Sequence, residues 1–303
     1  MSLAGAPAGL GLLSAGSWGG SDFVGGVAAR RSPALLVVAV GQVFTLAVLL
    51  ALCLAMHLAI PGDRYLLYSA VGGFEGALAL ALFYRALAAG AMGLTAALTG
   101  LLTALVPVIY AFLHDGLPAP PTLAGLAAGL IAIWLITHAP AAGKCVAGGG
   151  AAVPAALAQA AALAPRAQLW MGAAAGLGFG AQLILFKIGS AGGAMWAMTS
   201  MRVAGVAALL LVLAVRPPAG SGLGFWRRGF WVLGLLAGVL DTAGNGFYIW
   251  AAELGRLEAA AVICSLYPGV TILLAALVLR ERPTRRQIAG RVLALTAVAL
   301  LSV

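Results

Sequence analysis

The chain has 303 residues, of which 63% are hydrophobic and only 8% are charged, whereas charged residues make up about 25% of a typical soluble domain. This composition excludes a soluble globular protein and predicts an integral membrane protein. The net charge of +9 does not indicate a nucleic-acid partner, because the basic residues lie mostly in short gaps between apolar runs and form no continuous basic face.

Apolar runs long enough to cross a bilayer, which takes about 20 helical residues, follow one another along the chain. The longest connection, residues 141–167, is rich in Ala and Gly and separates a first half (1–140) from a second half (168–303). The sequence therefore predicts an all-α membrane protein with no domain outside the bilayer. We expect ten membrane helices, five in each half, at residues 8–28, 34–59, 65–88, 92–113, 120–140, 168–188, 194–215, 229–252, 258–279 and 286–303.

The two halves show signs of an internal repeat. Residues 84–125 align with residues 249–290 without a gap, and this alignment places Pro118 on Pro283 in equivalent turns. Because each half has an odd number of spans, the second half enters the membrane in the opposite orientation. The sequence therefore predicts two five-helix inverted repeats, a plan that places a substrate site near the membrane midplane between the halves.

The charged loops predict an orientation, because loops rich in Lys and Arg stay in the cytoplasm. Loops after even-numbered spans contain only Arg64 and Arg256. The distribution predicts that both termini lie outside. Loops after odd-numbered spans contain the other basic loop residues, which are Arg30, Arg31, Lys144, Arg166, Arg216, Arg227, Arg228, Arg280, Arg282, Arg285 and Arg286.

Two carboxylates are expected near the middle of equivalent spans, Glu75 in the third and Asp241 in the eighth. Charged groups inside a bilayer are costly and are functional candidates by default. We expect this pair to form the central polar site, in which one carboxylate takes a proton while the other contacts substrate. The alternative is that each is a structural group that forms a hydrogen bond to a neighbouring helix.

Further candidates lie at helical spacing. Asn245 and Tyr248 share one face of the eighth span with Asp241, which predicts a cavity wall. Trp18 and Asp22 are separated by one turn of the first span. Asp22 is either a gate or a helix-end partner of Arg30 or Arg31.

Arg202, in the seventh span, has two interpretations: it binds an anionic group of the substrate, or it neutralises a membrane carboxylate in an internal pair. Pro107 and Pro268 lie within the fourth and ninth spans, where a missing backbone donor permits a bend. We expect these two prolines to be hinges or static kinks.

Residues 267–290, YPGVTILLAALVLRERPTRRQIAG, resemble the EamA-like members of the drug/metabolite transporter superfamily. WGGSDF, FYRALAAG and LDTAGNGFYIWA extend the resemblance over most of the chain. The resemblance implies a transporter, and it implies cytoplasmic termini, in contrast to the charge distribution. In the family pattern a Tyr-Pro pair opens span nine, an acidic residue ends it, and a Gln and a Gly begin span ten; these positions hold Tyr267, Pro268, Glu281, Gln287 and Gly290.

We therefore expect a secondary transporter, and specifically an exporter, of small metabolites, amino acids or organic cations in a bacterial inner membrane. A proton gradient or the substrate's own gradient would drive it. The sequence has no phosphate-binding GxxxxGK[ST] loop, no zinc or disulfide spacing of Cys or His and no catalytic constellation, so we expect no enzyme, cofactor or metal site. The alternatives are a channel or receptor and, less favoured, a membrane-embedded enzyme.

Overall fold

The computed structural model describes residues 6–29, 32–88, 92–117, 119–137, 165–215, 228–278 and 285–301. Within these ranges all regular secondary structure is helical, as predicted. A helix coincides with each predicted span, and the ninth span consists of two helices. The helices are α1 (Ala6–Ala29), α2 (Ala34–Ala55), α3 (Asp63–Ala88), α4 (Met92–His114), α5 (Pro120–Thr137), α7 (Pro165–Ser190), α8 (Ala194–Val215), α9 (Arg228–Leu254), α10 (Leu257–Cys264), α11 (Tyr267–Val278) and α12 (Arg285–Leu301).

Several helices are long and apolar enough to cross a membrane. By length and composition these are Ala34–Ala55, Asp63–Leu87, Ala167–Ser190, Ala194–Val215 and Gly229–Leu254. Shorter apolar segments occur in α4, α5 and the α10–α11 region. Their outward faces carry exposed Leu, Val, Phe and Trp side chains, as expected for surfaces that contact lipid. The chain is thus an integral, multi-pass membrane protein.

Helix boundaries follow local chemistry. Pro120 and Pro165 are the first residues of α5 and α7, where the missing N–H has no intrahelical partner in any case. α8 follows a tight turn that ends at Gly193, whose φ of +123° is a conformation that side chains with a Cβ rarely adopt. The predicted connection 141–167 lies outside the described residues up to position 164, as does Glu281.

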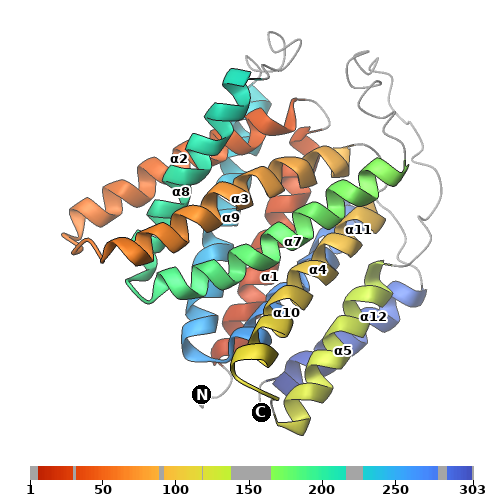
Figure 1. Ribbon diagram of the computed structural model, residues 1–303. Coiled ribbons are helices and arrows are strands. Elements are labelled where there is room, and N and C mark those ends of the chain that lie inside the picture. The colour runs from red at the N-terminus through yellow and green to blue at the C-terminus, as the bar shows by residue number, and fades with distance from the viewer. Residues whose placement is uncertain are drawn as a thin grey trace, which may run out of the picture.

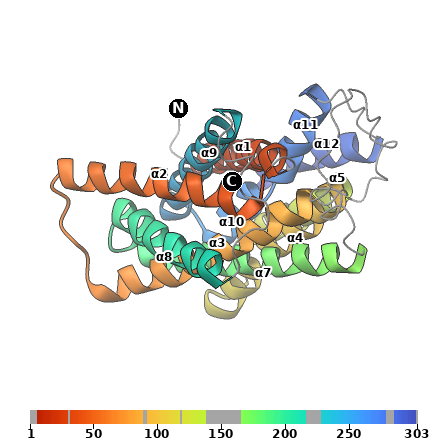
Figure 2. The ribbon, with the colours of Figure 1, turned by 90° about the horizontal axis from the view of Figure 1, so that it is seen from above.

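Helices from the two halves pack against each other throughout the molecule. α1 lies along α9, α3 lies between α7 and α8, and α4 lies along α7. α5 and α12 form a separate pair, visible at the lower right of Figure 1 and on the right of Figure 2. One close approach is between α2 and α9, where a Cβ on Gly41 would come within 2.8 Å of the Gly238 Cα. Glycine is required there because the two backbones touch.

The ninth span is interrupted near its centre. α10 ends at Cys264 and α11 begins at Tyr267, so the Tyr-Pro pair opens the second segment and not the span itself. Pro268 cannot donate the backbone hydrogen bond that would continue α10, which accounts for the break. By contrast, α4 continues through Pro107 without interruption. Broken helices that line a cavity are typical of secondary transporters.

Candidate functional site

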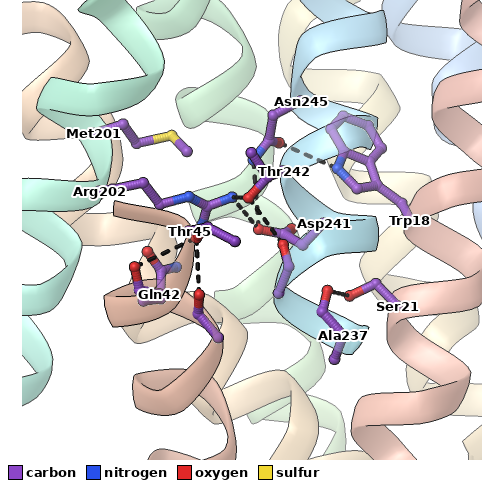
Figure 3. Close-up of polar contacts among 12 residues, drawn as sticks. Trp18, Ser21, Gln42, Thr45, Met201, Arg202, Ala237, Asp241, Thr242 and Asn245 are labelled. Carbon is purple, nitrogen blue, oxygen red and sulfur yellow. Dashed lines mark hydrogen bonds and ion pairs between the residues drawn. The ribbon is translucent and has the colours of Figure 1, made fainter. Parts of the chain in front are cut away.

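An ion pair joins α8 and α9 in the interior. Arg202 Nη2 donates to Asp241 Oδ2 at 2.6 Å and to Thr242 Oγ1 at 2.8 Å (Figure 3). The Arg202 side chain is 2% exposed and the Asp241 side chain 17%. A buried guanidinium is tolerated only with a close partner of opposite charge. Of the two interpretations of Arg202, the structure contains the internal pair.

The Asp241 carboxylate also belongs to a hydrogen-bonded chain that extends to α1. Asn245 Nδ2 donates to Asp241 Oδ2 at 3.4 Å, and Trp18 Nε1 donates to Asn245 Oδ1 at 3.1 Å (Figure 3). Asp241 and Asn245 are one turn apart on α9, so their side chains reach the same side of the helix. This chain fixes the Trp18 ring against the polar face of α9.

A cavity of about 50 Å³ lies beside this hydrogen-bonded chain. Its polar wall includes the predicted residues Trp18, Asp22, Asp241 and Asn245. These four residues, from two helices far apart in sequence, are therefore brought together. The full lining is Trp18, Asp22, Leu80, Thr103, Phe179, Gln182, Leu183, Asp241, Asn245 and Tyr267.

Asp22 differs from Asp241 in having no counter-ion among the residues that the structure describes. Its residue is 6% exposed, and no ion pair joins it to any residue that the structure describes. Arg30 and Arg31, the partners considered from sequence, lie outside the described residues. Arg202 does not line this cavity. The cavity wall thus holds one neutralised carboxylate and one carboxylate without a described cation partner.

Aromatic rings surround the two acids. The Trp18 and Tyr267 rings meet edge to face with centroids 6.4 Å apart, and Phe179 contributes a third ring to the lining. Tyr267 is presented at the break between α10 and α11. Pro268 sits next to Gly100 of α4, where an added Cβ would come within 2.7 Å of the proline ring. The break therefore both shapes the cavity and packs against a helix of the first half.

Besides Arg202, two predicted site residues, Tyr248 and Glu75, lie outside the lining of this cavity. Tyr248 is fully buried and donates its hydroxyl to the Leu183 carbonyl oxygen at 2.7 Å, so it holds α9 to α7 and does not line the cavity. Glu75 is half-buried and does not line the cavity, and the side chains that bond Asp241 are Arg202 and Asn245. The structure thus does not bring Glu75 and Asp241 together as a central pair.

The position of Glu75 follows from helical phase. Leu80 is the residue of α3 that lines the cavity, and Glu75 is five residues away, which corresponds to about 140° around the helix. Gly76 packs its face of α3 on Gln182 of α7. A prediction based only on a residue's depth in the membrane cannot tell which way the residue faces around the helix axis.

Sequence reasoning did not single out three polar residues of the site, Thr242, Thr103 and Gln182. The available signal was weak: Thr242 follows Asp241, and Gln182 is a polar residue within an apolar run. Thr103 was noticeable only because the alignment of the halves places it opposite Pro268. Of the family-motif residues, Tyr267 lines the cavity, while Gln287 and the buried Gly290 belong to α12.

A multi-helix membrane protein with a partly polar cavity beside a broken helix has the general design of a small-molecule transport protein. Residues 166–303 match the model of the EamA-like transporter family, which belongs to the drug/metabolite transporter superfamily. The match covers the second half of the chain, and the resemblance predicted from sequence is confirmed there.

The fold has a counterpart among solved structures. One, described only as the crystal structure of a protein, aligns with a TM-score of 0.68 over 97% of this chain and 95% of its own, with 18% identical residues. At that level of identity the likeness concerns the fold alone. No curated protein matches the chain.

Proposed function

We propose that the protein is a secondary transporter that exports small organic cations, such as amines and cationic metabolites, across a bacterial inner membrane. The observation that carries the proposal is the charge of the cavity wall. Asp241 is neutralised by Arg202, whereas Asp22 has no described counter-ion, so the wall has an excess of one negative charge whenever Asp22 is ionised. A ligand with one positive charge restores neutrality in this setting.

The rings beside Asp22 favour the same class of substrate. Trp18, Phe179 and Tyr267 line the cavity, and aromatic faces attract ammonium groups and also bury the apolar part of an amine. A carboxylate substrate would lie against Asp22 and could not reach Arg202, which does not line this cavity. The arrangement therefore favours a cation over an anion.

A proton can compete with the substrate for the same group. When Asp22 is protonated, the wall carries no excess charge; when an ammonium group binds, the proton leaves for water and the ammonium takes its place. Such competition for one carboxylate couples an inward proton to an outward cation. Asp22 replaces Glu75 in the mechanism expected from sequence, with Asp241, Asn245 and Trp18 as the positioning groups.

The architecture proposed for this cycle is ten membrane spans in two inverted five-helix repeats, residues 1–140 and 168–303. Reciprocal packing supports it: α1 lies along α9 just as α7 lies along α3, and α4 lies along α7 just as α10 and α11 lie along α1. These pairs exchange when the two halves are exchanged, as a repeat requires. Rocking of the halves around the cavity would give alternating access.

Transport in sealed proteoliposomes tests the proposal. The substrates would be a quaternary ammonium, a primary amine, a neutral amino acid and a dicarboxylate, each with and without an imposed pH gradient. We expect saturable flux of the cations that responds to the gradient. In Asp22→Asn, kcat/KM for the cations should fall roughly 10- to 100-fold, the effect of losing one charge-assisted hydrogen bond. Saturable flux of the dicarboxylate alone, or cation flux unchanged in Asp22→Asn, would refute the cation proposal.

A further inference from the structure

A second cavity lies on the far side of the ion pair. Its volume is about 10 Å³, and Asp241 and Leu80 line both this cavity and the first one. Arg202 lines the second cavity only. The ion pair therefore forms part of the wall between them. The second cavity is lined by Val37, Val38, Gly41, Gln42, Leu80, Tyr84, Arg202, Ala237, Gly238 and Asp241.

Two buried polar atoms of its lining residues have no hydrogen-bond partner. They are the Oε1 atom of Gln42, a residue 7% exposed, and the Nε atom of Arg202, a residue 2% exposed. Each unpaired group costs free energy in a buried site, so such atoms call for an explanation. One is an acceptor and the other a donor. A molecule that satisfies both must donate and accept, and water does so.

The size of the cavity fits the same ligand. A cavity needs a volume of about 10–15 Å³ to hold one water molecule, so this one is of the size for a single water. Its remaining polar groups are already engaged: Tyr84 shares a hydrogen bond with Ser21, and Asp241 is paired with Arg202. The open hydrogen-bonding positions therefore belong to Gln42 and Arg202.

The packing of α2 keeps the Gln42 amide beside the helix that carries Arg202. A Cβ on Gly205, one turn after Arg202 in α8, would come within 3.1 Å of Gln42 Oε1. On its other side, α2 touches α9 at Gly41 and Gly238. Gln42 thus lies where α2, α8 and α9 meet, on the Arg202 side of the ion pair (Figure 3).

We propose that the second cavity binds water, and that this water and Gln42 Oε1 form an alternative site for the Arg202 guanidinium when Asp241 turns toward a cation. This rests on the proposed function, in which an ammonium group enters the first cavity. Asp241 cannot neutralise both the Arg202 guanidinium and the substrate's ammonium group. A buried guanidinium without a partner is strongly destabilising. The second cavity supplies the replacement acceptors, and Gln42 is a positioning residue for the exchange.

The other polar groups around Asp241 are not free to accept a hydrogen bond from Arg202. Asp22 on α1 and Tyr267 on α11 line the first cavity, away from Arg202. Tyr84 on α3 is hydrogen-bonded to Ser21, and Thr242 already accepts from Arg202. Among the described residues that line the second cavity, Gln42 is therefore the acceptor that remains open to Arg202.

Thermal unfolding of the purified protein in detergent tests the alternative site without requiring transport. Asp241→Asn removes the partner of Arg202 and should lower the Tm. Adding Gln42→Glu to Asp241→Asn should raise the Tm again by roughly 2–4 °C, because a carboxylate now faces Arg202 from the second cavity. Adding Gln42→Leu should lower the Tm by more than the same substitution does in the wild type.

Gln182 provides the matched control, because it lines the first cavity and not the second. Gln182→Glu should not rescue Asp241→Asn. A fall in Tm on adding Gln42→Glu, strict additivity of Gln42→Leu, or equal rescue by Gln182→Glu would each overturn the proposal.

Should the Asp241→Asn variants not fold, the wild type answers the question through an experimental structure that shows ordered water. Density for water bonded to Gln42 and Arg202 supports the site, and a dry cavity overturns it. Absent cation transport would refute the proposed function alone, since neither the stability cycle nor the water density depends on flux.

Discussion

Three of the carboxylates in the helices, those of Asp22, Glu75 and Asp241, lie in different surroundings. Asp241 is bonded to Arg202, Asp22 lines the first cavity without a described cation partner, and Glu75 is half-buried on α3 with its Oε1 atom unpaired. A residue's type and depth in the sequence do not distinguish these settings. The three should therefore respond differently to the same neutral replacement.

Asp241→Asn should destabilise the protein by about 3–5 kcal/mol, because it leaves the guanidinium of Arg202 buried without its counter-ion. The measurement is the free energy of unfolding in mixed micelles. The double variant Asp241→Asn/Arg202→Leu removes both charges and should recover much of this loss. If the double variant is less stable than Asp241→Asn, the ion pair does not account for the effect.

Asp22→Asn and Glu75→Gln form the contrasting pair for binding. Asp22→Asn should weaken binding of a labelled ammonium compound while preserving the fold, because it removes the excess charge of the cavity wall. Glu75→Gln should leave binding within about twofold, because Glu75 does not line the cavity. Equilibrium binding to purified protein measures both. A larger loss in Glu75→Gln than in Asp22→Asn would restore the site expected from sequence.

For single residues, the sequence could predict which side chains of one helix share a face, because helical spacing determines this. Asp241 and Asn245 share a cavity wall because they are one turn apart, and Trp18 and Asp22 do so for the same reason. The rotation of α3 that turns Glu75 away depends on how glycine faces pack between helices. The pairing of Arg202 with Asp241, 39 positions later, depends on how α8 packs against α9.

Two prolines in apolar helices, Pro107 and Pro268, have different effects on helix continuity. α4 continues through Pro107, whereas the ninth span ends one helix before Pro268 and begins another. Both have the same local signal in sequence, a missing N–H. The difference lies in the surroundings of the two prolines. Pro268 packs on Gly100, and the preceding residue, Tyr267, lines the first cavity.

Pro268→Ala should slow transport more than Pro107→Ala. Restoring the N–H allows α10 and α11 to join, which stiffens the one broken span of the described chain. We expect kcat to fall several-fold with little change in KM, because the substrate groups remain in place. Steady-state flux in proteoliposomes separates the two parameters. Equal kcat values for the two variants would mean that the break does not move during the cycle.

Glycine contacts give a second prediction for the elements. Gly238→Ala should destabilise the α2–α9 contact, because the new Cβ would lie 2.4 Å from the Gly41 Cα. Gly16→Ala is the control: nothing lies within 4 Å of its Cβ, and the helix gains about 1 kcal/mol of propensity. Thermal unfolding should show a lower Tm for the first variant and an unchanged or higher Tm for the second. A similar Tm for both would contradict the observed close packing.

For the molecule as a whole, hydropathy predicts the helix positions well, whereas the sequence match between the two halves gives only a weak prediction of the repeat. Helix positions follow from apolar runs because a bilayer fixes their length, and the observed helices agree with the predicted spans to within a few residues at most ends. The alignment of the halves was weak, because Ala, Leu and Gly satisfy helix packing almost anywhere in this chain. The reciprocal packing of α1 on α9 and α7 on α3 is a stronger indication of the repeat than any residue match.

Orientation is the property of the whole molecule on which the two lines of sequence reasoning disagree. Basic residues concentrate in loops after odd-numbered spans, which predicts that both termini lie outside, whereas the family resemblance implies that they lie in the cytoplasm. The N and C marks at the same end of Figure 1 agree with an even number of crossings and suit either orientation.

From the charge distribution, we expect alkaline phosphatase fused after Val303 to be active and a fluorescent protein fused there to be dark. Fusions within the loop that holds Arg282 should give the reverse, because one span separates the two points. Fluorescence after Val303 would mean that the loops after odd spans face outward despite their charge, and that something other than basic residues orients this chain.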